Sequence, residues 1–178
     1  MTGNPEQGYP VGPYSGKAYE RFRRWYAAHV LHRLPGSKRK RIVRYAKASL
    51  HYHGRMVYTE GPQRGELFHR PRGRFRGAHA DCSQFSASLC HWTGVHSVTD
   101  SDWTGTLCHK GQRVREAEAG CFVFFGEPPY VHMGVMVNTK RVIGFGTQAS
   151  PDESSLAGLL AYFAGTGHPG FEFRDLTV

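Results

Sequence analysis

Three short apolar segments follow one another between residues 120 and 146, and their succession restricts the fold more than any other feature of the sequence. They cover residues 120–126, 131–137 and 141–146, and turn-forming residues separate them. Apolar runs of this length, bounded by turn residues, are typical of buried β-strands. Connections this short join antiparallel neighbours. The sequence therefore predicts an antiparallel meander.

Amphipathic helices are expected before the meander, because apolar residues recur there at three- and four-residue steps. One stripe covers residues 17–34. A second begins at Ser37, a suitable N-cap, and stops near residue 54. A third covers residues 82–92, with Asp81 as its N-cap.

Further elements complete an α+β layout. A short helix is expected to start at Thr99 or Asp100, a last helix around residues 154–164, and a closing strand at residues 171–174. Residues 61–80 are rich in Gly, Pro and Arg and are expected to form a long loop.

The length of 178 residues is that of one ordinary domain. We expect residues 1–16 to be an irregular lead-in, residues 17–54 a basic helical segment, and residues 55–178 the core. No apolar stretch approaches the roughly 18 residues of a membrane helix, so stable membrane insertion is not expected. The start of the chain lacks the basic and apolar parts of a secretory signal.

Positive charge is concentrated in the first part of the chain. Residues 1–76 hold 17 of the 23 Lys and Arg against four acids, a net charge of +13, and the remainder is net negative. A one-sided basic segment is typical of proteins that contact nucleic acid, a membrane surface or a polyanionic cell wall. A solvated face that only aids solubility is the alternative. The Arg-Gly run around Phe75 would also suit single-stranded nucleic acid.

The four cysteines are expected to be reduced thiols rather than a disulfide framework. They form no Cys-x-x-Cys pair, and the two Cys-His dipeptides have neither zinc-ribbon nor zinc-finger spacing. We therefore expect no metal and no cofactor. Cys90, Cys108 and Cys121 are interpreted as small buried apolar residues.

Cys82 is the candidate nucleophile, because the first turn of a helix offers free backbone N–H groups and the positive end of the dipole. That position would stabilise a thiolate and lower the thiol pKa. The N–H groups around Cys82 and Ser83 could also hold an oxyanion. His132, on a meander strand, is the candidate base. A buried thiol and an unrelated histidine among 11 are the simpler alternative.

These residues stand in an ordered set of motifs that resembles the NlpC-type cysteine peptidases of bacterial cell walls. The set comprises Asp-Cys-Ser-x-Phe at residues 81–85, Ala-Gly-x-Phe-Val-Phe-Phe-Gly at 119–126 and His-x-Gly-Val-x-Val at 132–137. The Arg64 context resembles the peptidase modules of mycobacteriophage and other actinobacterial phage endolysins. The resemblance covers about residues 55–151.

The resemblance implies a papain-like core, with extra N-terminal helices here, that cleaves stem or cross-link peptides of peptidoglycan. Cys82 would be the nucleophile and His132 the base. The backbone N–H of Cys82, aided by the Tyr58 hydroxyl, would stabilise the oxyanion. For Tyr58, a residue at the edge of the core is the alternative.

The histidine-orienting group is missing from its usual place. Relatives have a polar side chain shortly after the base, where this chain has Gly-Phe-Gly at residues 144–146. Gln148 is the nearest substitute, Asp152 and Glu153 are its rivals, and Asp81 is a more distant candidate. A working dyad of Cys82 and His132, or a damaged enzyme, would need none of these orienting groups.

The leading hypothesis is a monomeric phage lysin that lacks a signal peptide, is made in the host cytoplasm and acts on the wall after release. Its partners would be peptidoglycan and anionic envelope polymers, with no nucleic acid expected. A CHAP-type N-acetylmuramoyl-L-alanine amidase would use the same thiol chemistry on a different bond. A non-catalytic basic module that binds the wall is the alternative from a different class.

Overall fold

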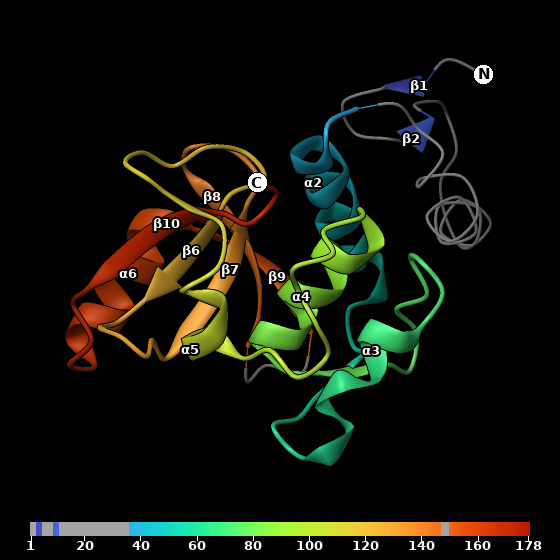
Figure 1. Ribbon diagram of the computed structural model, residues 1–178, viewed down its shortest axis with the longest axis horizontal. Coiled ribbons are helices and arrows are strands. Elements are labelled where there is room, and N and C mark those ends of the chain that lie inside the picture. Colours follow the sequence, from blue (N-terminus) through green and yellow to red (C-terminus); the bar gives the residue numbers. More distant parts are fainter. Residues whose placement is uncertain (1–2, 5–8, 11–35, 147–149) are drawn as a thin grey trace.

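A six-stranded antiparallel sheet forms the centre of the part of the chain that the structure describes (Figure 1). The computed structural model describes residues 3–4, 9–10, 36–146 and 150–178. The strand order is β5-β10-β6-β7-β8-β9. Their bounds are β5 (Gln112–Val114), β6 (Phe122–Phe125), β7 (His132–Met136), β8 (Arg141–Phe145), β9 (Pro151–Ser155) and β10 (Phe171–Asp175).

The predicted meander is confirmed as β6, β7 and β8, and the closing strand β10 pairs with β6. The two edge strands were not predicted. β9 reads Pro-Asp-Glu-Ser-Ser and has no apolar alternation, so its extended form comes from pairing with β8 rather than from its own preference. The structure is thus of the expected α+β class.

Two helices predicted from apolar spacing are confirmed. α2 (Lys38–Ser49) begins at Ser37, whose side chain accepts a hydrogen bond from the N–H of Lys40, and a 3-10 turn, η2 (Leu50–Tyr52), follows it. α4 (Cys82–Trp92) begins at Asp81. The helix predicted over residues 17–34 lies outside the described residues.

The sheet separates two hydrophobic clusters, as Figure 1 shows from the helices on its two sides. Met133 and Val135 of β7 belong to the cluster that contains α2 and α4. Met136 belongs to the other cluster, together with Phe125 of β6 and α6 (Leu156–Gly165). Each buried side chain of this size contributes about 1.5–3 kcal/mol relative to an exposed one.

The segment 61–80 is not the single long loop that was predicted. It contains η3 (Pro62–Gly65), α3 (Glu66–His69) and β4 (His79–Ala80), and β4 pairs in parallel with β3 (Val57–Tyr58). The carboxylate of Glu66 binds both Arg70 and His79, so it ties the two ends of the segment together. The Gly and Pro content of the segment suggested conformational freedom. The side-chain hydrogen bonds of Glu66 restrict that freedom.

The short helix predicted at Thr99 or Asp100 begins later, as α5 (Thr104–Leu107). The buried carboxylate of Asp102 accepts hydrogen bonds from the N–H of Thr99 at 2.7 Å and the hydroxyl of Thr106 at 2.9 Å. Asp102 therefore holds residues 99–103 as a turn before the helix.

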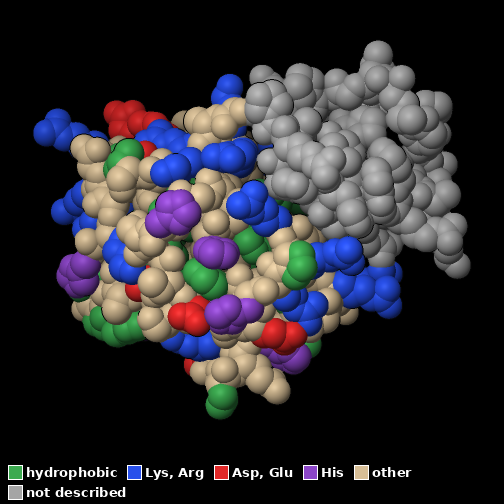
Figure 2. Space-filling model, turned by 45° about the vertical axis from the view of Figure 1, so that its right-hand side comes forward, with side chains coloured by type: hydrophobic (Ala, Val, Ile, Leu, Met, Phe, Trp, Pro, Cys, Tyr) green, Lys and Arg blue, Asp and Glu red, His purple; other side chains and the backbone are tan. Residues whose placement is uncertain are grey.

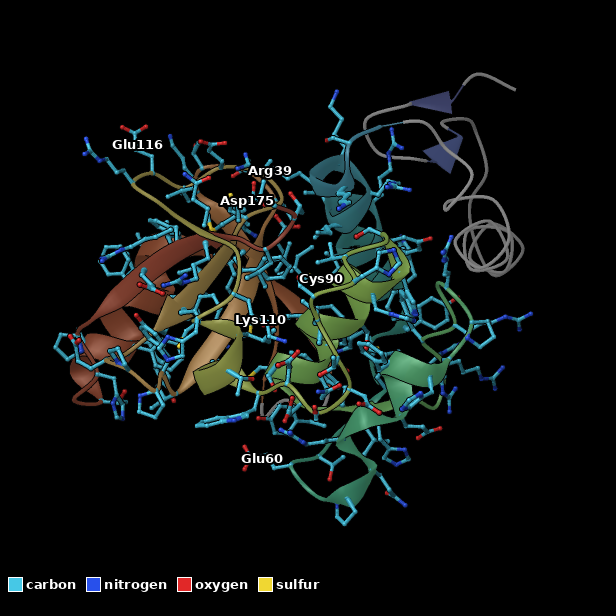
Figure 3. All side chains as sticks on the ribbon, in the orientation of Figure 1. Arg39, Glu60, Cys90, Lys110, Glu116 and Asp175 are labelled. Atoms are coloured by element: carbon cyan, nitrogen blue, oxygen red, sulfur yellow. The ribbon has the colours of Figure 1, made fainter. Side chains whose placement is uncertain are left out.

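Arg39 joins α2 to the sheet. Its guanidinium donates to Asp175 of β10 at 2.8 Å and also binds Glu118, and Figure 3 shows Arg39 and Asp175 close together at this junction. Gly120, with φ at +85°, lies against the same residue, because a Cβ there would stand 2.5 Å from the Cβ of Arg39. Only glycine allows this approach.

Two short strands in the lead-in, β1 (Gly3–Asn4) and β2 (Tyr9–Pro10), pair antiparallel, where an irregular segment was predicted. The rest of residues 1–16 lies outside the described part. Within the described ranges, no helix combines the length and apolar character that crossing a membrane requires.

Candidate functional site

The N-terminus of α4 is organised by Asp81. Its carboxylate accepts hydrogen bonds from the N–H of Gln84 at 2.6 Å and from the Ser83 hydroxyl at 2.7 Å. Arg64 donates to its other oxygen at 3.0 Å. These bonds cap the helix and hold Cys82 at its first position.

Cys82 is buried, with 6% of its surface exposed. Burial raises the pKa of its thiol to about 12, and the Asp81 charge adds to this effect. Hydrogen bonds from the backbone N–H groups of Met133 and Ser83 work in the opposite direction. The expectation that the helix terminus makes this sulfur a thiolate is therefore wrong for this conformation: loss of hydration outweighs the dipole.

His132 is the first residue of β7 and points to the face of the sheet covered by α6. Its ring stacks on Phe163 of α6, with centroids 5.6 Å apart, and on Phe125 of β6. Burial lowers its pKa to about 4, while the Asp81 charge acts in the opposite direction. The imidazole is therefore neutral at pH 7.

The sulfur and the imidazole both lie beside the first residues of β7. The N–H of Met133 points at the sulfur, whereas the neighbouring His132 packs among the rings on the α6 face. The structure thus brings the two groups to adjacent positions along β7, with the imidazole on the face that α6 covers. Strand alternation directs the Met133 side chain to the other face, into the cluster that contains α2 and α4.

Two cavities meet beside this stretch. One, of about 190 Å³, contains Cys82 and Arg64, and the other, of about 420 Å³, contains His132 and Asp152. Both are lined by Tyr58, Glu60 and Val131, so they share one wall. A substrate that lies along this wall would contact both groups.

Tyr58 stands at the shared wall. Its hydroxyl donates to Glu60 at 3.0 Å, and its ring packs edge-on against Phe145. Burial is the main cause that raises its pKa, so the hydroxyl keeps its proton and can donate it in a hydrogen bond. The Ser83 hydroxyl is not available as a donor to a substrate, because it is buried and donates to Asp81. Only the backbone N–H of Ser83 acts on the sulfur.

The structure distinguishes the candidates for the group that orients His132 by their positions and partners. Gln148 lies outside the described residues. Glu153 forms an ion pair with Arg141 at 3.0 Å. Asp152 lines the same cavity as His132. Asp81 acts on His132 only through its charge and is engaged by Arg64.

Several residues of the site were not found from the sequence. Trp103, which is 43% exposed, and Val131, which is 48% exposed, form apolar edges of the Cys82 cavity, and Phe163 covers the imidazole. No motif marks them. Glu60 follows Tyr58 by two residues, and this short spacing is the sequence feature that could have identified Glu60 as part of the site. Figure 3 shows Glu60 near η3, beside the lower end of α4.

Among residues 36–146 and 150–178, no three or more His, Cys, Asp or Glu side chains are grouped so that they could hold a metal ion. The four thiols are unpaired and buried. Burial also raises the pKa of Cys90, which is fully enclosed in α4.

No protein-family model matches this chain, and no curated protein matches it in sequence.

Proposed function

We propose that the protein is a papain-like cysteine peptidase of the NlpC type, which hydrolyses peptide bonds of bacterial peptidoglycan as part of a phage lysin. One observation carries the proposal. The sulfur of Cys82 lies at the first turn of α4, near enough to the backbone N–H of Met133 for that group to lower the thiol pKa, and Met133 is the strand residue next to His132. Cys82 lines a cavity of about 190 Å³.

The resting pair is neutral rather than a thiolate and an imidazolium. Burial raises the pKa of Cys82 and lowers that of His132, so both shifts favour the uncharged forms. His132 would act as a general base during attack. It is the first residue of β7 and precedes Met133, whose backbone N–H lowers the pKa of Cys82, so the base stands one residue from the backbone beside the sulfur.

The proposed reaction has two steps. First, the thiol proton moves to His132 while the sulfur bonds to the substrate carbonyl carbon. The oxyanion is held by the backbone N–H of Cys82 and by the Tyr58 hydroxyl, whose one proton would turn from Glu60 to the oxyanion. The C–N bond then breaks, and His132 returns the proton to the leaving amine. Water next attacks the thioester, releases the acid and restores the thiol.

A non-catalytic wall-binding module is the second candidate, and one observation favours it. His132 packs among the rings on the α6 face, and within the described ranges no hydrogen bond joins it to Cys82. A site that no longer catalyses hydrolysis would keep the cavities without bringing the sulfur of Cys82 and the imidazole of His132 into contact.

The test compares two cysteine variants of the full chain on purified diaminopimelate-type sacculi. Cys82→Ala should abolish the release of new amino termini. Cys90→Ala is the matched control, because this thiol lies in the same helix but is enclosed in the core, and it should retain activity. Circular dichroism checks that both variants fold.

The result separates the candidates. Release that persists in Cys82→Ala would remove this sulfur from the mechanism, and no release by the unaltered chain would leave the binding module. Fragment masses identify the bond, since an amidase would free whole stem peptides from the sugar. Cleavage within the peptides is the expected outcome.

A further inference from the structure

The outer end of the His132 ring extends over a bare part of β8. A Cβ placed on Gly144 would stand 3.2 Å from Nε2 of the imidazole, and one on Gly146 would stand 3.9 Å from Cε1. Residues 144 and 146 therefore supply no side chain to this end of the ring. The lack of side chains also keeps the space beside Nε2 open.

The next strand places a carboxylate beside that space. Asp152 of β9 is the register partner of Gly144. Cross-strand partners project from the same face of a sheet, so Asp152 projects from the face that carries His132. The cavity of about 420 Å³ is lined by His132, Gly144 and Asp152 together.

Other nearby acids are engaged elsewhere. Glu153 is the partner of Ile143, a residue of the α4-side core, and its carboxylate binds Arg141. Glu60 accepts the hydroxyl of Tyr58. No hydrogen bond or ion pair joins Asp152 to any residue within the described ranges, so its carboxylate is available there.

We propose that Asp152 is the positioning residue for His132, and that it reaches across the bare glycine of β8 to accept the Nε2–H directly or through one water molecule. The bond would fix the tautomer with the proton on Nε2, which leaves Nδ1 free to take the proton of Cys82. This inference rests on the proposed function for its catalytic meaning. Its geometry, however, can be tested without any activity.

The test measures the His132 tautomer in the full chain by ¹⁵N NMR at pH 7. We expect the Nε2–H form to dominate in the unaltered protein and Asp152→Ala to give a mixture of tautomers. Asp152→Asn keeps an acceptor oxygen and should retain much of the preference. Glu153→Ala is the matched control on the same strand and should leave the tautomer unchanged.

Activity on sacculi gives the second readout. Asp152→Ala should lower kcat by at least about tenfold with little change in KM, because the residue orients the base rather than binds substrate. An unchanged tautomer in Asp152→Ala would overturn the inference. If the tautomer shifts but Cys82→Ala remains active, the positioning role stands and the proposed peptidase mechanism fails.

Discussion

At the scale of single residues, burial decides the chemistry of the proposed dyad. The helix terminus and two N–H donors favour a thiolate at Cys82, yet lost hydration is the larger effect and raises its pKa to about 12. Burial lowers the pKa of His132 instead of raising it, because the charged form of histidine is the cation. Local position suggested an activated sulfur, whereas the packing of α4 on the sheet determines the outcome.

The lowered pKa of His132 predicts a pH-dependent stability. Its folded pKa of about 4 lies below its ordinary value of 6.5, so between these values the unfolded chain binds more protons. The free energy of unfolding should therefore fall as pH drops from 6.5 towards 4, by at most about 3.4 kcal/mol. Urea unfolding at several pH values measures it.

His132→Asn is the informative variant, since it removes the titrating ring and should flatten the fall above pH 5, where carboxylates titrate little. His91→Asn serves as the comparison. Burial is the first cause that lowers the pKa of His91 as well, but this ring lies at the far end of α4. An equal pH slope with and without the ring of His132 would contradict the assignment.

At the scale of elements, α4 is the organiser of the site. Its first turn carries the sulfur, and its N-cap carboxylate serves both the helix and Arg64. The same charge raises the pKa of Cys82. One side chain thus stabilises the helix at the expense of thiol reactivity.

Two substitutions of Asp81 should separate these effects. Asp81→Asn keeps an oxygen that can cap the helix but removes the charge, so the pKa of Cys82 should fall and its alkylation by iodoacetamide should become faster. Asp81→Ala also removes the cap and should cost about 1 kcal/mol of unfolding free energy. Mass spectrometry of the modified thiols and urea unfolding give the two readouts.

Ser37→Ala is the matched control for the capping effect, because Ser37 caps α2 through its hydroxyl. It should reduce stability similarly while leaving the alkylation rate of Cys82 unchanged. A Cys82 rate that is the same in Asp81→Asn and in the unaltered chain would show that the charge does not control the thiol.

At the scale of the whole molecule, positively charged side chains of the basic part of the sequence lie on the surface. Figure 2 shows Lys and Arg side chains spread over one face, with histidines between them. Lys40 of α2 and Arg72 and Arg76 after α3 are exposed. Several cations on one face favour attraction to an anionic polymer, which salt weakens.

We expect Arg72→Ser with Arg76→Ser to weaken binding to cell walls that carry teichoic acid and to reduce its salt dependence. The matched control is Arg115→Ser with Lys140→Ser, which removes the same charge from exposed positions in the other part of the chain. A pelleting assay at increasing salt measures both. Equal losses in the two variants would indicate that only net charge matters.

The sequence alone determined the local features of this protein. Apolar spacing and capping residues defined α2 and α4, and short apolar runs defined β6, β7 and β8. These features depend on neighbours along the chain, so a period or a cap is enough to find them.

Tertiary structure decided which chemical groups meet. β9 is a strand only because β8 pairs with it, and that pairing sets Asp152 on the face of His132. The register of β7 places the imidazole among the rings of Phe125 and Phe163, although the sulfur lies beside Met133. Register and burial arise from contacts between residues far apart in the chain, which is why local patterns did not reveal them.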